Sequence, residues 1–98
     1  MKLVLIYRDE ATADIAEAMR WYRSKGPGLD ERLLSEVLEC EAFIIQHPKG
    51  APVVYKHFRQ FPLKGFPYVM LFGIWHEELI VYRLFHTGQN PKRKFKRK

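Results

Sequence analysis

Hydrophobic residues recur with two different periods along the chain, and the change of period marks its predicted elements. Between residues 10 and 24 the apolar positions recur every three or four residues, which is the spacing of an amphipathic helix. Residues 29–46 repeat this spacing, and Pro48 ends the second predicted helix. The apolar stripes are formed by Ala11, Ile15, Ala18 and Tyr22 in the first helix and by Leu33, Val37, Cys40 and Ile44 in the second.

Runs of β-branched and aromatic residues predict four strands. They cover residues 2–7, 53–61, 66–75 and 79–86. The last two are nearly continuous in apolar residues, which is typical of strands that are covered on both faces. We therefore expect the helices to cover one face of these strands and another chain to cover part of the other face.

The order of the elements predicts an α+β fold. One strand is followed by two helices and then by three strands, and only Gly26-Pro27-Gly28 separates the helices. So short a connection favours an antiparallel helical hairpin. We expect an N-terminal strand and a helical hairpin packed on one face of a mainly antiparallel four-stranded sheet.

Length and composition indicate one domain. The 98 residues are 47% hydrophobic, which is enough for one packed core. We assign residues 1–91 to this domain and residues 92–98, which hold six cations, to a basic C-terminal tail. The longest apolar run, Tyr68–Trp75, has eight residues, whereas a membrane helix needs roughly 20. The apolar stretch after Met1 is too short for a signal peptide, so we expect a cytoplasmic protein without membrane contact.

Candidate metal ligands are sparse. The single cysteine, Cys40, allows no internal disulfide and is expected to be a small core residue. The four histidines lie at least ten residues apart, without the close spacing of a ligand pair. The sequence also contains no glycine-rich phosphate-binding loop. We therefore predict neither a metal nor a cofactor.

Charge is distributed unevenly along the chain. The net charge is +6, yet residues 1–46 carry a net charge of −3 and residues 47–98 a net charge of +9. Cations interleaved with aromatic residues are typical of surfaces that bind nucleic acid. A solvated strand face with a frayed basic terminus, or a tail that docks on an acidic protein, would give the same pattern. The candidate target-binding residues are Lys56, Arg83, Arg93, Lys94, Phe95 and Arg97, with Tyr55, Phe58 and Tyr82 as candidates for stacking.

Three residues of the second half are candidates for RNA cleavage. Attack by the 2′-hydroxyl of RNA needs a base, an acid and cations beside the phosphate. His86 ends the last predicted strand, Lys64 is expected at the same end of the sheet, and Arg59 could reach that region from the neighbouring strand. Alternation along a regular strand places Arg83 on the face opposite His86. The structural alternative for His86 is a half-buried ring that a backbone group satisfies.

The order of short motifs resembles the RelE/ParE superfamily of toxins from bacterial type II toxin–antitoxin modules. Each motif is permissive, but their order and spacing over nearly the whole chain are fairly specific. The motifs are residues 13–18 leading to Trp21-Tyr22, then Gly28-Leu29, residues 44–48, Phe58-Arg59, residues 66–68, residues 81–86 and Asn90-Pro91.

This resemblance implies a toxin that a cognate antitoxin wraps and holds inactive. RelE-like members of the superfamily cut mRNA on the ribosome, and ParE-like members poison DNA gyrase. Arg59 and His86 match the cleavage residues, but Gln89 stands where an arginine is common and Phe95 lacks a hydroxyl. The long helical hairpin is more similar to that of ParE-type members.

We therefore expect a DNA gyrase poison without catalysis of its own. One alternative is a ribosome-dependent mRNA endonuclease, in which Arg59, Lys64 and His86 would carry the reaction. Another is a non-toxic basic module that binds nucleic acid.

Overall fold

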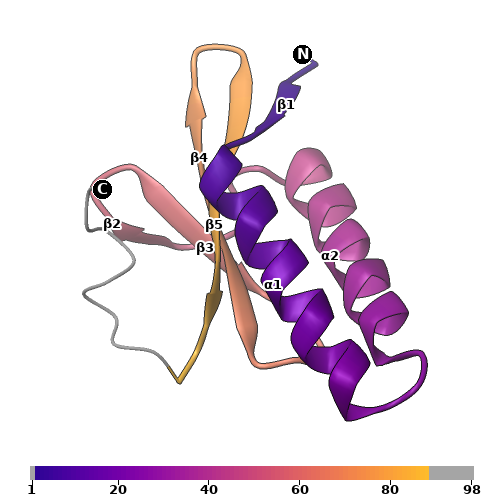
Figure 1. Cartoon of the computed structure of the whole chain (residues 1–98). Coiled ribbons are helices and arrows are strands. Elements are labelled where there is room, and N and C mark those ends of the chain that lie inside the picture. Colours follow the sequence, from indigo (N-terminus) through magenta and orange to yellow (C-terminus); the bar gives the residue numbers. More distant parts are fainter. Residues whose placement is uncertain (1, 89–98) are drawn as a thin grey trace.

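The computed structural model describes residues 2–88 and has two layers, a helical hairpin and a sheet (Figure 1). The sheet has the strand order β1-β5-β4-β3-β2, in which β1 is parallel to β5 and all other neighbours are antiparallel. Both helices lie on one face of the sheet, which confirms the predicted α+β class. The elements are β1 (Val4–Tyr7), α1 (Asp9–Lys25), α2 (Leu29–Gln46), β2 (Val53–Tyr55), β3 (Phe58–Pro62), β4 (Tyr68–Trp75) and β5 (Glu78–His86).

The sheet has five strands, whereas the sequence predicted four. The predicted strand over residues 53–61 is divided into β2 and β3 by a tight turn at Lys56 and His57. Lys56 has a φ of 51°, which an extended strand does not accommodate. The chain therefore reverses at this point, and β2 pairs with β3 as a hairpin.

The core lies between the helical hairpin and the helix-facing side of β4 and β5. The predicted stripe of α2 is confirmed, because Leu33, Val37, Cys40 and Ile44 are all buried. The alanines of the first stripe, Ala11 and Ala18, are buried too, and their small size lets α1 approach the sheet closely. The sheet side of the core consists of Met70, Phe72, Leu79, Val81 and Leu84.

A bulge in β5 changes which residues face the helices. Leu71 pairs with Arg83 and Phe72 with Val81, so Tyr82 is the extra residue on the β5 side. Beyond the bulge the pairing is regular as far as Tyr68 and His86. Because the bulge precedes both Arg83 and His86, these two residues lie on opposite faces of the strand, as alternation predicted.

The other face of the central strands is buried to a greater extent than the sequence suggested. We expected another chain to cover part of this face. At Val69, Leu71 and Phe85, however, the side chains are already buried within this chain. At these three positions no second chain is needed, and partial cover of the remaining face by another chain stays a prediction.

Gly73 has no side chain, and this leaves room for the rings of His57 and Tyr82 on this face. A Cβ atom at position 73 would lie 3.0 Å from His57 Cδ2 and 3.2 Å from Tyr82 Cε2. We expect Gly73→Ala to lower the free energy of unfolding by about 1 to 3 kcal/mol, because the rings must move to admit the methyl group. Denaturant unfolding measures this cost, which should shrink in a His57→Ala background. An equal cost in both backgrounds would contradict the close approach of His57.

A hydrogen bond from Tyr7 connects β1 to α2, and this tyrosine makes the free energy of unfolding depend on pH in the alkaline range. Its hydroxyl donates a hydrogen bond to Glu41 Oε1 over 3.0 Å. Burial, and next the negative charge of Glu41, raise the pKa of Tyr7 well above its ordinary value.

As pH rises above about 10, the unfolded chain therefore releases this proton before the folded chain does. We expect the free energy of unfolding to fall there by up to about 1.4 kcal/mol per pH unit on account of Tyr7. Tyr7→Phe should remove this contribution. The difference in stability between the wild type and the variant should be constant below about pH 9 and change above it. Parallel curves at every pH would contradict the prediction.

Candidate binding surface

Aromatic rings and a cation gather around the β2–β3 hairpin. The rings of His57 and Phe58 stack with centroids 4.4 Å apart, and Tyr82 meets Phe58 edge-on at 5.0 Å. Tyr55 lies parallel to Phe58 at 6.4 Å and is 44% exposed. The Lys56 ammonium lies 5.3 Å from the centre of the Tyr55 ring. We call this group, Tyr55, Lys56, His57, Phe58 and Tyr82, the hairpin surface.

The structure thus brings together four residues that the sequence singled out separately. Tyr55, Phe58 and Tyr82 were predicted for stacking, and Lys56 was predicted to contact a target. The turn at Lys56 and the bulge at Tyr82 place them side by side. Exposed tyrosine next to a cation is a combination that suits protein and nucleic-acid partners alike.

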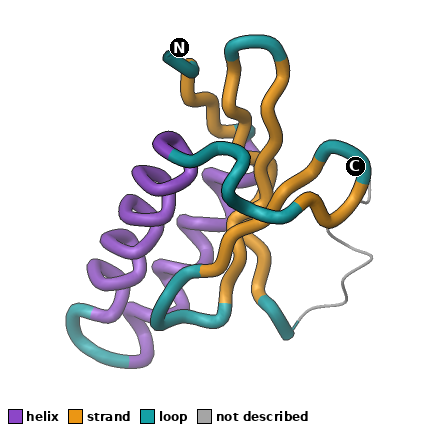
Figure 2. Tube along the Cα trace, turned by 180° about the vertical axis from the view of Figure 1, so that it is seen from behind, coloured by secondary structure: helices purple, strands orange, loops and turns teal. Residues whose placement is uncertain are grey.

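The hairpin surface adjoins an open edge of the sheet. β2 is the last strand in the sheet order, so within residues 2–88 its outer edge pairs with no further strand. Val53 and Val54 are exposed there. Figure 2 shows the loop that leads from α2 to this edge. An exposed apolar edge strand is a template for strand addition by a partner.

Arg59 is bound to this connecting loop. Its Nη1 atom donates a hydrogen bond of 2.6 Å to the carbonyl oxygen of Ala51 and a longer one of 3.5 Å to that of Lys49. Arg59 pairs with Phe72, four residues along β4 from Tyr68, which is the partner of His86. At about 3.3 Å per residue, this separates the two positions by roughly 13 Å along the strands.

Lys64 and His86 lie at the same end of the sheet, as predicted, but beside different helices. Lys64 is exposed and its Nζ atom lies 3.9 Å from Glu39 Oε1 on α2. His86 instead lines a cleft of about 300 Å³ beside α1, together with Asp14, Glu17 and Trp21. The described structure therefore does not place Arg59, Lys64 and His86 around one cleft.

His86 has the contacts expected of a structural residue, whose ring a backbone group satisfies. The backbone N–H of Gly88 donates to His86 Nδ1 over 3.0 Å. The ring also meets Tyr68 edge-on, with centroids 5.1 Å apart. Both contacts orient the imidazole at the end of β5.

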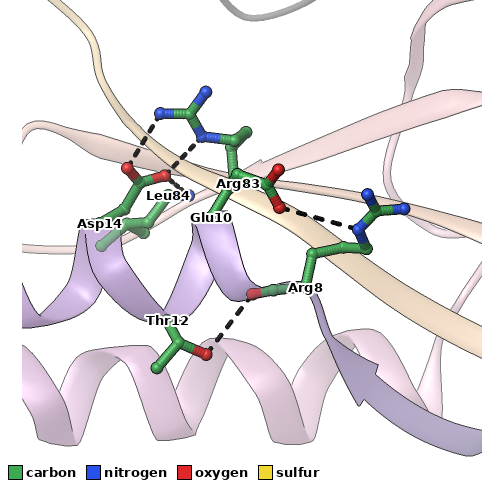
Figure 3. A network of polar contacts seen from close by, with 6 residues as sticks. All are labelled: Arg8, Glu10, Thr12, Asp14, Arg83 and Leu84. Carbon is green, nitrogen blue, oxygen red and sulfur yellow. Dashed lines mark hydrogen bonds and ion pairs between the residues drawn. The ribbon is translucent and has the colours of Figure 1, made fainter. Parts of the chain in front are cut away.

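Arg83 is held by α1. Its Nε and Nη2 atoms donate to the two carboxylate oxygens of Asp14 over 2.7 and 2.9 Å, and the Leu84 N–H donates to the same carboxylate (Figure 3). These hydrogen bonds raise the pKa of Arg83, so it remains a cation. The charge of Arg83 is thus paired with Asp14, and the predicted target-binding residue joins β5 to α1 in this structure instead of presenting a free cation.

Sequence reasoning missed the roles of Asp14 and Trp21. Asp14 occurred there only as part of a family motif, and nothing local linked it to Arg83. Trp21 and Tyr22 are adjacent, and since neighbours on a helix point about 100° apart, both could not face the core. Tyr22 packs against the core and Trp21 is exposed.

Other predicted residues lie outside the described part of the chain. The candidate target-binding residues Arg93, Lys94, Phe95 and Arg97 belong to residues 89–98. In residues 2–88 no three His, Cys, Asp or Glu side chains are arranged to hold a metal ion. No helix there combines the length and apolar character that crossing a membrane requires.

Known structures share this architecture. A structure titled "Chromosomal ParDE TA system from P. aeruginosa" matches with a TM-score of 0.71 and 19% identity, covering 86% of this chain and 95% of that one. The E. coli DinJ-YafQ toxin–antitoxin complex matches with a TM-score of 0.63 and 12% identity, over 88% and 93% of the two chains. This chain thus shares its fold, a helical hairpin on an open sheet, with chains from these two toxin–antitoxin structures.

The sequence identifies the family within this fold. Residues 5–91 match the model of the ParE toxin of the type II toxin–antitoxin system parDE. The chain therefore belongs to the ParE toxin family. A search of curated protein sequences finds no match to it.

Proposed function

We propose that this ParE-family toxin arrests growth in the cytoplasm by poisoning DNA gyrase through binding, without catalysis of its own. The observation that carries the proposal is the family match over residues 5–91. The separation of Arg59 from the end of the sheet where Lys64 and His86 lie also favours binding over RNA cleavage. The hairpin surface and the basic tail supply aromatic rings and cations for the gyrase–DNA complex.

We further propose that a cognate antitoxin neutralises the toxin. Both matched structures come from toxin–antitoxin systems, and one of them is a complex. In this chain the exposed valines of β2 and the open edge of that strand suit a partner that adds a strand. Such a partner would also cover Tyr55 and Lys56, which adjoin this edge.

The test compares two targets side by side. Purified protein is added to gyrase with supercoiled plasmid and, separately, to ribosomes translating a defined message. Trapped double-strand breaks that require gyrase, without message cuts, are the expected result. Message cuts without gyrase-dependent breaks would overturn the proposal in favour of the mRNA endonuclease.

The variant Arg59→Ala with His86→Ala distinguishes the two activities further. Gyrase poisoning should persist in this double variant when circular dichroism shows that it is folded. If the protein is instead an endonuclease that uses Arg59 and His86, message cutting should be lost. Absence of both activities in the wild type would favour the non-toxic nucleic-acid-binding module.

A further inference from the structure

An apolar pocket lies between α2 and the loop that joins β3 to β4. Its volume is about 360 Å³. Phe43 forms one wall and is 38% exposed, although its ring stacks on Phe61 with centroids 4.5 Å apart. The remaining apolar lining comes from Cys40, Pro62 and Leu63. A pocket of this kind suits a single apolar or aromatic side chain.

The rim of this pocket is mainly acidic, with Lys64 as its one basic residue, although the protein as a whole has a net charge of +6. Glu36 and Glu39 line it, and α2 as a whole carries five acidic residues and one basic residue. Glu36 accepts a hydrogen bond of 2.7 Å from the backbone N–H of Gly65. Glu39 is 66% exposed and lies 3.9 Å from the Lys64 ammonium, so it can face a further cation. The pocket therefore suits an aromatic side chain with positively charged neighbours.

The chain itself contains a segment with this chemistry. Residues 92–98 read Lys-Arg-Lys-Phe-Lys-Arg-Lys, so Phe95 is the one apolar residue among six cations. A segment of this charge repels the basic second half of the chain and is attracted to α2, the acidic helix.

The last described residues lie close enough for this segment to reach the pocket. The Thr87 N–H donates to the Pro67 carbonyl over 2.8 Å, and the Leu63 N–H donates to the Tyr68 carbonyl over 2.9 Å. The end of β5 and the pocket residue Leu63 thus flank the start of β4. Two strand spacings separate β5 from β3, about 10 Å. The seven residues from Gln89 to Phe95 span up to about 23 Å when extended.

We propose that this pocket is the docking site for the chain's own C-terminal tail. Phe95 enters the pocket, and the neighbouring lysines and arginines face Glu36 and Glu39. The docked tail is withheld from anionic partners, so an encounter with such a partner must first release it. The proposal concerns the free protein and does not depend on which target the toxin attacks.

Pro62→Cys provides a probe, because position 62 is exposed and lines the pocket. The native Cys40 is buried, and burial raises the pKa of its thiol, so it reacts slowly. The probe reaction is alkylation of the full-length Pro62→Cys protein by iodoacetamide at low salt. A short linker holds the tail near the pocket at about millimolar effective concentration, so release of the tail by Phe95→Ala should accelerate alkylation about tenfold. Glu36→Gln with Glu39→Gln should accelerate it as well, and so should high salt.

Matched variants and a cross-link separate docking from a change in stability. Asn90→Ala in the same segment and Glu31→Gln on α2 should leave the rate unchanged, and denaturant unfolding checks every variant. A photoreactive benzoylphenylalanine at position 95 should cross-link within one chain to residues 36–43. Equal alkylation rates of Pro62→Cys with and without Phe95→Ala would overturn the proposal. Cross-links between two chains, or rates that depend on protein concentration, would replace it with docking on a second copy.

Discussion

Replacing Asp14 with alanine should lower the free energy of unfolding by about 3 kcal/mol, a large effect for one residue near the protein surface. The Asp14 carboxylate accepts two hydrogen bonds from Arg83 and one from the N–H of Leu84. The side chains of Asp14 and Arg83 are only 15% and 23% exposed. Removal of the carboxylate therefore leaves a poorly solvated charge and a backbone donor without their acceptor.

The position of Asp14 in the fold explains why this carboxylate is needed. β1 pairs with β5 only as far as Tyr7 and Val81, and the chain then turns into α1. Leu84 lies beyond this paired region, on the edge of β5. Asp14 supplies the acceptor that a longer β1 would have provided, and so fixes α1 against β5.

Denaturant unfolding of Asp14→Ala, Arg83→Met and the double variant measures this coupling. The double variant should be much less destabilised than the sum of the single variants, because neither partner is then left unpaired. Glu10→Gln is the matched control on α1. Its ion pair with Arg8 spans 3.8 Å between exposed side chains, so its loss should cost less than about 1 kcal/mol. A similarly small cost for Asp14→Ala would show that the contact does not stabilise the fold.

If the protein poisons gyrase as proposed, changing Tyr55 to serine and Lys56 to glycine together should weaken this activity about 100-fold while the protein stays folded. An exposed tyrosine at an interface is worth about 2 kcal/mol or more, and loss of the adjacent cation slows association further. Lys56 has a φ of 51°, a conformation that glycine adopts without strain. Lys56→Gly should therefore offset part of any stability lost with the ring.

The second tight hairpin of the sheet offers a matched control. Trp75 is 61% exposed, and His76 has a φ of 56°, so an aromatic residue again precedes a residue of positive φ. Here, however, the acidic residues Glu77 and Glu78 follow. Trp75→Ser with His76→Gly makes the same kind of change on an acidic turn and should leave poisoning unchanged.

The concentration of toxin that gives half-maximal gyrase-dependent plasmid breaks measures both variants. Repeating the titration at several salt concentrations tests the electrostatic part of target binding. Loss of the Lys56 cation should reduce the dependence of the half-maximal toxin concentration on salt. Equal potency of the two variants would exclude the hairpin surface as the contact with gyrase. A loss of potency confined to the control would place that contact at the β4–β5 turn.

The sequence by itself determined both helices, the central hairpin of β4 and β5, and the fold class. Helical periodicity identified both helices and the buried stripe of α2, since a period near 3.6 leaves one consistent set of inward positions. The apolar runs before and after the turn at residues 76–78 likewise predicted the central hairpin. These signals are local, so they can be recognised without knowing what each element packs against.

Only the tertiary structure decided how the candidate functional residues are grouped. Asp14 and Arg83 are 69 positions apart, and no sequence pattern indicates that they meet. The turn at Lys56 and the bulge at Tyr82 likewise decide which rings form the hairpin surface, because the turn reverses the chain and the bulge shifts side-chain direction by one residue. Lys64 and His86 share an end of the sheet yet face different helices. Such groupings depend on packing between distant segments, which local periodicity does not encode.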